Sequence, residues 1–259
     1  MPDPFSASPD PPDGMFARTI DLLGRQAFDA LQRARVVVVG LGGVGSHAAS
    51  ALARGGVGHL RLVDFDRLTR SSLNRHLIAR QQDVGQSKAG VLATHLGQVC
   101  PGAQIEVCEA FFHLDTAEAI LGGPVDFVVD AIDSFNPKVA LLRHCVQHEI
   151  DVVACMGASA RTNSTLVRVG DLSQTRVCPL ARAVRRRLAH EGIRTGIVAV
   201  YSVEEPLPPL PPDDEDLVLQ RGRPRNRLPS LSYMPGIFGY VAASEVLLRI
   251  SGRPAGRAR

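Results

Sequence analysis

The segment R-V-V-V-V-G-L-G-G-V-G-S, residues 35–46, decides the fold class of this chain. Its first half is a continuous run of β-branched residues, which is typical of a strand buried in a parallel sheet. The glycines at 40, 42 and 45 then match the pattern G-x-G-x-x-G. Such glycines let the backbone turn tightly and approach a phosphate group at the N-terminus of the next helix. The segment therefore predicts a strand, a phosphate-binding loop and a helix.

Apolar patterns on both sides of this segment alternate between the helical and the strand period. A helix is expected over 17–32, with a break near Gly24. Beyond the glycine loop we expect helices at 46–54, 87–99, 115–121 and 137–148, and strands at 59–64, 104–108, 125–130 and 151–155. This alternation predicts an α/β fold with a Rossmann-like, doubly wound, mostly parallel sheet.

After about residue 160 the pattern changes. The run T-L-V-R-V-G-D-L, residues 165–172, predicts an antiparallel strand, and it is followed by a basic helix at 179–190 and a strand at 197–202. A turn is expected at Pro235–Gly236 before a closing amphipathic helix that ends near Ile250. These elements form an antiparallel C-terminal extension of the sheet.

Composition indicates one domain with two irregular parts. Residues 1–14 carry five prolines and little apolar content, so we expect a disordered arm. The domain then covers 15–259, with a mobile loop at about 205–229 where prolines and charges cluster. The sequence has no run of about 20 apolar residues that spans a membrane. Its five cysteines include no C-x-x-C pair, which predicts reduced thiols in the cytoplasm and excludes the common zinc-ribbon spacing.

Three charged residues extend the phosphate loop into a nucleotide site. Asp64 ends the second strand, 19 residues beyond Gly45, where an acid normally holds a ribose hydroxyl pair. Arg75 lies in the polar loop S-S-L-N-R-H, and Lys88 begins a helix. An NAD-dependent oxidoreductase is the alternative owner of the glycine pattern. Cations around a polyphosphate favour triphosphate cleavage instead, because charge develops there.

The loop D-A-I-D-S, residues 130–134, follows another predicted strand. Asp130 would lie at the carboxyl end of that strand, where it is a natural Mg²⁺ ligand opposite a triphosphate. The alternative is a helix cap. Asp133 precedes the helix expected from Pro137 by too far to cap it, so its role stays open between the loop and the site.

These segments resemble the ubiquitin-activating-like adenylating enzymes, whose bacterial members include the ThiF and MoeB types. The matching elements are G-L-G-G-V-G-S, D-F-D at 64–66, the Arg75 loop, V-G-Q-S-K at 84–88 and D-A-I-D-S. The resemblance implies that ATP and Mg²⁺ are bound, with Asp130 as the metal ligand and Arg75 and Lys88 at the phosphates. It also implies nucleotide contacts from the following residues: Gly40, Gly42, Gly43, Gly45, Asp64, Asp66, Ser72, Arg75, Lys88 and Asp133. Ser72 and His76 depart from the Asn and Gln usual in the family.

The C-terminal half looks like the tRNA threonylcarbamoyladenosine dehydratase branch of that family, through C-P-L-A-R-A-V-R-R-R-L and L-P-S-L-S-Y-M-P-G-I-F-G. Cys178 stands where this branch commonly has Asp. The resemblance implies that the threonyl carboxylate of a modified adenosine in the tRNA anticodon loop is adenylated and then captured by a nitrogen of its own urea group. It also implies a homodimer and allows a sulfur-relay partner. The alternative is activation of the C-terminus of a ubiquitin-like sulfur-carrier protein.

Two clusters of arginines are suited to contacts with RNA phosphates. The predicted basic helix and its end carry Arg182, Arg185, Arg186, Arg187 and Arg194, and the proline-rich region carries Arg221, Arg223, Arg225 and Arg227. An ordinary solvated surface is the alternative for both. His144 and His148 share a helix face at a spacing able to bind metal, but two ordinary helix histidines are the favoured interpretation.

Overall fold

A computed structural model describes residues 14–211 and 228–253 of the chain. Seven strands form one sheet in the order β3-β2-β1-β4-β5-β7-β6. The strands are β1 (Arg35–Val39), β2 (His59–Val63), β3 (Gln104–Cys108), β4 (Phe127–Asp130), β5 (Asp151–Cys155), β6 (Val167–Asp171) and β7 (Val198–Ser202). All neighbouring strands pair in parallel except β6 and β7, which are antiparallel. The predicted fold class is confirmed.

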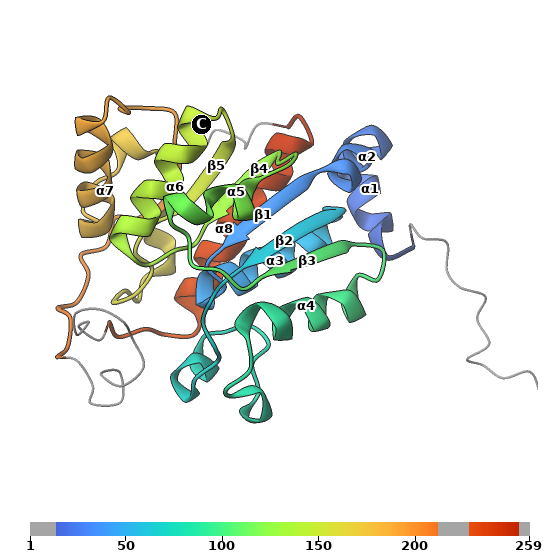
Figure 1. The fold of residues 1–259 in the computed structure, drawn as a ribbon, viewed down its shortest axis with the longest axis horizontal. Coiled ribbons are helices and arrows are strands. Elements are labelled where there is room, and N and C mark those ends of the chain that lie inside the picture. The colour runs from blue at the N-terminus through green and yellow to red at the C-terminus, as the bar shows by residue number, and fades with distance from the viewer. Residues whose placement is uncertain (1–13, 212–227, 254–259) are drawn as a thin grey trace, which may run out of the picture.

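The helices cover both faces of this sheet (Figure 1). They are α1 (Ala17–Leu23), α2 (Arg25–Arg33), α3 (Gly43–Gly55), α4 (Lys88–Val99), α5 (Ala117–Leu121), α6 (Phe135–Gln147), α7 (Pro179–His190) and α8 (Tyr233–Ile250). In β1, Val36 and Val38 pack into one core with α3, α4 and α8, whereas Val37 and Val39 pack into the other with α5, α6 and α7. Because both faces of β1 are buried, its β-branched run is continuous.

Chain order along the sheet reverses at β1. From β1 the chain passes to β2 and β3 on one side, then returns to β4 on the other. The carboxyl ends of β1 and β4 therefore flank the crevice where open α/β sheets bind their ligands. The glycine loop after β1 and the loop 130–134 after β4 both lie at this edge.

Two helices begin earlier than the sequence predicts, and their starts change the interpretation of the site. Helix α3 begins at Gly43, not at 46, and α6 begins at Phe135, not at 137. The predicted break at Gly24 is confirmed, since α1 ends and α2 begins there and Gly24 has a φ of +88°.

The predicted turn at Pro235–Gly236 is wrong, because both residues lie within the first turn of α8. A proline is compatible with that position, since the N–H groups of the first helical turn have no intrahelical partner.

Residues 1–13 of the expected arm and 212–227 of the expected loop lie outside the described residues, as do the four arginines between 221 and 227. Gly14, the last residue of the predicted arm, belongs to a short 3₁₀ helix, Gly14–Phe16. No helix in the described ranges combines the length and the hydrophobicity that crossing a bilayer requires.

Candidate functional site

The glycine loop joins β1 to α3. Gly40 has a φ of +89°, and a Cβ at Gly40 would come within 2.9 Å of the Ala131 backbone. A Cβ on Gly45 would collide with the carbonyl oxygen of Gly40, so neither position accepts a side chain. Gly42 is the N-cap of α3, and a Cβ there would meet nothing within 4 Å. The loop therefore has one open approach, at the N-terminus of a helix, as a phosphate group needs.

Asp64 follows β2 and holds the glycine loop in place. Its Oδ2 accepts a hydrogen bond from Leu41 N at 2.6 Å, and its Oδ1 accepts one from Asp66 N at 2.8 Å. Burial raises the pKa of Asp64, and the charge of Lys88 opposes this shift. Each carboxylate oxygen retains a lone pair for a ribose hydroxyl. The ribose-binding role stays a prediction.

Lys88 and Arg75 approach the loop from two different elements. Lys88 is the first residue of α4, and its Nζ lies 2.8 Å from Asp66 Oδ2. The stem of Arg75 lies against the first turn of α3, since a Cβ on Gly43 would be 3.2 Å from Arg75 Cγ. Burial and then the charges of Lys88, His47 and Arg75 lower the pKa of His76 to about 4. Arg75 Nη1 donates to Ser71 O at 2.7 Å within its own loop. The structure thus places two cationic side chains beside the glycine loop, each held by a neighbouring residue.

Ser72 and His76, the two departures from the family pattern, are both buried. Ser72 Oγ accepts a hydrogen bond from Thr69 N at 3.2 Å and completes a capping box for the 3₁₀ helix Arg70–Asn74. His76 Nε2 has no hydrogen-bond partner among the described residues. Ser72 therefore stabilises the Arg75 loop, and its contact with a nucleotide stays a prediction.

Asp130 does not present a carboxylate to the crevice. Its side chain is fully buried, with Oδ2 2.6 Å from Lys138 Nζ and Oδ1 accepting from Ile132 N at 3.1 Å. Lys138 is equally buried and also donates to Cys155 O at 2.9 Å. A metal ion at Asp130 would have to displace these partners, so this geometry does not favour the predicted metal role. Helix capping is not observed either, because Ser134 is the N-cap of α6.

Asp133 is the exposed carboxylate of the same loop. It immediately precedes the N-cap Ser134, whose Oγ donates to Asp133 Oδ1 at 3.1 Å. The predicted gap between Asp133 and the helix is wrong, because α6 begins two residues earlier than expected. The contact between Gly40 and Ala131 places this loop against the glycine loop. Asp133 is therefore better placed than Asp130 to meet a ligand in the crevice.

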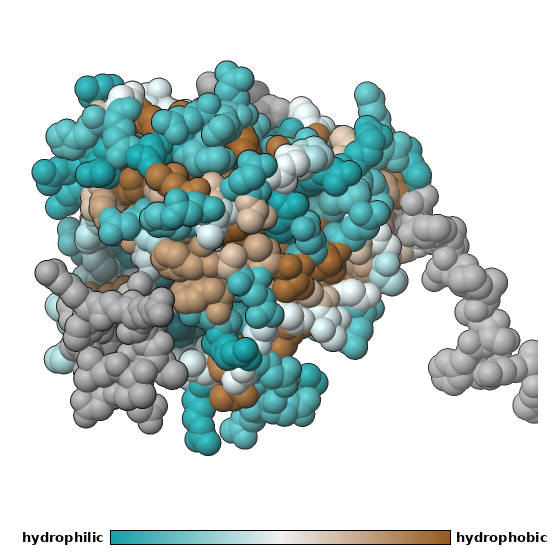
Figure 2. Space-filling model, in the orientation of Figure 1, coloured by the Kyte–Doolittle hydropathy of each residue, from teal (hydrophilic) through white to brown (hydrophobic). Residues whose placement is uncertain are grey.

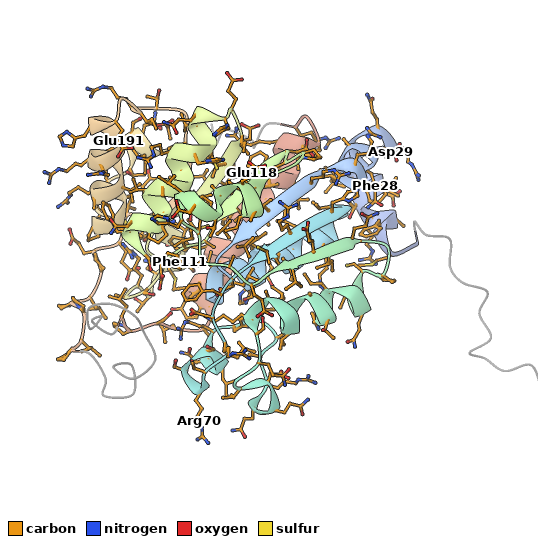
Figure 3. All side chains as sticks on the ribbon, viewed as in Figure 1. Phe28, Asp29, Arg70, Phe111, Glu118 and Glu191 are labelled. Atoms are coloured by element: carbon orange, nitrogen blue, oxygen red, sulfur yellow. The ribbon has the colours of Figure 1, made fainter. Side chains whose placement is uncertain are left out.

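An aromatic pair beside Asp64 was missed by the sequence-based prediction. Phe65 and Phe111 are 55% and 41% exposed, and their ring centroids lie 5.0 Å apart. Phe111 lies near the middle of the view in Figure 3, where Figure 2 shows apolar surface. The sequence offered one signal for this pair, because Phe65 is an aromatic residue between the two acids of D-F-D. An exposed aromatic platform suits stacking by a nucleobase.

One arginine of the basic helix is bonded within the fold, since the half-buried Arg185 donates to the carbonyl and the hydroxyl of Thr175. Arg187 pairs with Glu191, the residue labelled at the end of α7 in Figure 3, but its side chain is 61% exposed. The remaining predicted arginines of this region, Arg182, Arg186 and Arg194, are exposed as well. The candidate RNA-binding surface thus lacks only Arg185 among these predicted residues.

His144 and His148 have ring centroids 4.1 Å apart. Within the described part of the chain, no three His, Cys, Asp or Glu residues are grouped so that they could hold a metal ion.

The unit formed by β1, the glycine loop and α3 carries Asp64, Arg75 and Lys88 beside it. Together with the loop 130–134 at the same edge of the sheet, this arrangement is typical of adenylating enzymes. The chain belongs to the ThiF family, whose model matches residues 16–258.

Within that family, the chain is similar to tRNA threonylcarbamoyladenosine dehydratases. It is 40% identical over 250 residues to dehydratase 2 of Saccharomyces cerevisiae, covering 91% of this chain and 56% of that relative. It is 32% identical over 253 residues to the Escherichia coli dehydratase, covering 93% of this chain and 94% of that protein. The chain thus spans little more than half of the yeast relative and nearly all of the bacterial one.

The fold matches a solved structure of the same kind. The crystal structure of E. coli tRNA N6-threonylcarbamoyladenosine dehydratase, TcdA, in complex with ATP superposes with a TM-score of 0.81 at 31% identity. The match covers 93% of this chain and 95% of that one.

Proposed function

We propose that this protein uses ATP to cyclise threonylcarbamoyladenosine in tRNA, with loss of water, through an adenylated carboxylate. The observation that carries the proposal is the gathering of Asp64, Arg75 and Lys88 around the open end of the glycine loop. It occurs in a fold that matches an ATP-bound dehydratase along almost its whole length.

In the first step, an oxygen of the threonyl carboxylate attacks the α-phosphorus of ATP, and pyrophosphate leaves. Negative charge on the phosphate oxygens is stabilised by Arg75, by Lys88 and by the N–H groups at the start of α3. Lys88 is the first residue of α4, and its ammonium group is held in place by the pair with Asp66. This arrangement fixes the ammonium group before ATP arrives, so little reorganisation is needed.

In the second step, a urea nitrogen of the same substrate attacks the acyl carbon, AMP leaves, and the nitrogen loses its proton. The product contains a five-membered ring. Capture within one molecule has an effective molarity of about 10⁵ M or more, so this step needs no enzyme nucleophile. Burial raises the pKa of the Cys145 and Cys155 thiols to about 12, which leaves both as poor nucleophiles.

Mg²⁺ fits this site through Asp133. Mg²⁺ usually takes one or two carboxylates together with phosphate oxygens, so a single exposed carboxylate beside the phosphates is sufficient. When bound, the ion would neutralise charge on the leaving pyrophosphate. Asp130 instead supports the loop that carries Asp133, through its buried pair with Lys138.

Three exposed arginines of α7 and its end that are not paired with Glu191, Arg182, Arg186 and Arg194, are proposed to contact tRNA phosphates. Helix α7 packs against α6, whose first turn follows Asp133. A tRNA lying on α7 therefore has a nucleotide within reach of the crevice when its anticodon loop is splayed open, as sequence-specific RNA recognition requires.

The experiment is mass spectrometry of nucleosides from threonylcarbamoyl-modified tRNA incubated with the full chain, ATP and Mg²⁺. A product lighter than the substrate nucleoside by one water, formed only with ATP, is expected. ATP-dependent adenylation of a carrier protein, with tRNA left unchanged, would replace this proposal. Assembly into a homodimer, a sulfur-relay partner and a cytoplasmic location stay predictions.

A further inference from the structure

Among the described residues, Arg161 is a buried cation without a counter-charge at bonding distance. Arg161 follows β5 at the carboxyl edge of the sheet and is 3% exposed. Its Nη1 donates to the carbonyl oxygens of Gly157 and Ser159, the second at 3.0 Å. Its Nε and Nη2 are buried and have no hydrogen-bond partner among the described residues. An arginine keeps its charge in proteins, so such an environment is costly unless an anion fills it.

The two unpartnered nitrogens of Arg161, Nε and Nη2, form one edge of its guanidinium group. In a guanidinium group, Nε–H and Nη2–H point the same way and form a fork that matches the two oxygens of a carboxylate or a phosphate. The two carbonyls at Nη1 fix the plane of the group in advance. Arg161 is therefore oriented to bind an anion through the Nε/Nη2 edge, while Nη1 is reserved for the protein.

No acidic side chain in the described ranges satisfies this edge. The charge of Arg161 contributes to lowering the pKa of Glu204, so the two groups are within electrostatic reach. However, the oxygens of Glu204 accept hydrogen bonds from Thr162 and Asn163, and no ion pair joins it to Arg161. Cys178 lies on the Nη1 side instead, since a Cβ on Gly157 would be 3.4 Å from Arg161 Nη1 and 3.7 Å from Cys178 Sγ. Its thiol carries no charge-bearing oxygen for the fork.

The position of Arg161 in the sheet indicates which anion it binds. β5 lies two strands from β1 in the sheet order, which is about 10 Å at the usual strand spacing. The phosphates belong at the loop after β1, so the end of β5 lies in the other half of the crevice, where the second substrate approaches. Both nitrogens of the edge are closed from solvent in this structure. The preceding residue, Ala160, is bonded through its backbone to Pro229 O at 2.6 Å and to Leu207 N at 2.8 Å. Binding of an anion at the edge requires a local rearrangement of the residues around Arg161.

We propose that the Nε/Nη2 edge of Arg161 binds the carboxylate that this enzyme adenylates. The inference rests on the proposed function and adds a substrate-binding residue to it. A carboxylate held at this edge is oriented and kept from bulk water while one oxygen faces the α-phosphate.

The test measures ring closure on threonylcarbamoyl-modified tRNA by the full chain, as KM for tRNA, KM for ATP and kcat. Arg161→Met keeps the length of the side chain but removes its charge and donors. It is expected to raise the KM for tRNA about 10- to 100-fold, as loss of a charge-assisted hydrogen bond does, with the KM for ATP unchanged. Arg161→Lys should recover part of the loss. Arg168→Met, which removes an exposed arginine on β6, is the matched control.

A second variant separates binding from a structural role. Arg161→Gln keeps a neutral donor on a side chain of similar reach and removes a buried charge that has no partner among the described residues. It is therefore expected to keep the melting temperature of the wild type or to raise it, while it raises the KM for tRNA and leaves the KM for ATP unchanged. This variant also decides the question if Arg161→Met does not fold.

The outcomes distinguish failure of the proposed function from failure of the role inferred for Arg161. A wild-type protein that does not cyclise the tRNA overturns the proposed function and this inference together. An active wild type with an unchanged KM for tRNA in Arg161→Met or in Arg161→Gln overturns only the inference. A parallel rise in the KM for ATP would assign Arg161 to the phosphates and would likewise overturn it.

Discussion

Lys138 Nζ lies 2.6 Å from Asp130 Oδ2 in an ion pair whose two side chains are both fully excluded from solvent. Lys138 also donates to Cys155 O, so the pair links the ends of β4 and β5 to α6. The backbone of Ala131, next in the chain, touches Gly40. The pair thus supports the loop that carries Asp133 and the wall of the phosphate-binding loop. Lys138 is one of only two lysines in this arginine-rich chain. Its compact ammonium group fits a buried site that a guanidinium group would overfill.

Lys138→Met is expected to reduce the free energy of unfolding by about 3–5 kcal/mol, because it leaves the Asp130 carboxylate buried without a partner. Burial already raises the pKa of Asp130, and Lys138 opposes that shift. Without Lys138 the folded-state pKa rises further above the unfolded value, so the variant should lose stability as the pH rises. Urea denaturation at pH 5 and pH 8 measures both effects.

The double variant Asp130→Asn/Lys138→Met serves as the control. It should recover part of the lost stability and should not show the added pH dependence. Equal stability of Lys138→Met and wild type at pH 8 would show that the pair contributes nothing.

Arg75→Ala and Lys88→Ala are each expected to lower the rate of ring closure about 10²-fold or more, because each removes charge stabilisation from the phosphates. Nucleoside mass spectrometry over time gives the rates, and the melting temperature checks the fold. Arg70→Ala is the matched control, because the Arg70 side chain points away from the body of the protein in Figure 3. Wild-type turnover in either variant would remove that residue from the site.

Asp133→Asn is expected to raise the Mg²⁺ concentration needed for half-maximal activity about 10-fold at fixed ATP, because one metal ligand loses its charge. Asp130→Asn should instead lower the stability, with little change in the Mg²⁺ requirement of the folded protein. A magnesium titration of both variants compares the two carboxylates directly. The reverse pattern would return the metal role to Asp130.

The double variant Arg182→Glu/Arg186→Glu is expected to weaken tRNA binding and to make the dependence of log K on log salt shallower by up to about 1.4–1.8, since each phosphate contact contributes about 0.7–0.9. Filter binding or fluorescence anisotropy at several salt concentrations measures the slope. ATP affinity should not change. Arg33→Glu, an exposed arginine at the opposite edge of the sheet, is the control. An unchanged slope assigns these arginines to an ordinary solvated surface.

His76→Gln is expected to flatten the acid side of the stability profile. The pKa of His76 is about 4 in the folded protein, below its ordinary value, so protonation favours unfolding. The wild type should therefore lose stability as the pH falls from about 6.5 towards 4. The variant should lose less over the same range, as measured by urea denaturation. Parallel profiles would show that His76 is not held neutral by its surroundings.

The order and type of the central elements could be predicted because their signals are local. The run from Arg35 to Ser46 combines a β-branched strand with glycines whose backbone requirements are visible in the sequence. Helix starts were less accurate: α3 and α6 each begin two or three residues before the predicted position. Pro235 was read as part of a turn because a proline has the same local signature at a turn and in the first turn of a helix.

The sequence by itself determined the fold class, the phosphate loop and the charged residues around it, since spacing along strands and helices places them at one sheet edge. Only the tertiary structure decided which of those side chains face the crevice. Asp130 and Asp133 look equivalent in D-A-I-D-S, but Asp130 is buried against Lys138, which also donates to the carbonyl of Cys155 at the end of another strand, whereas Asp133 is exposed. The vacant edge of Arg161 was invisible for the same reason: whether a buried charge has a partner depends on contacts between distant segments, and local sequence does not encode them.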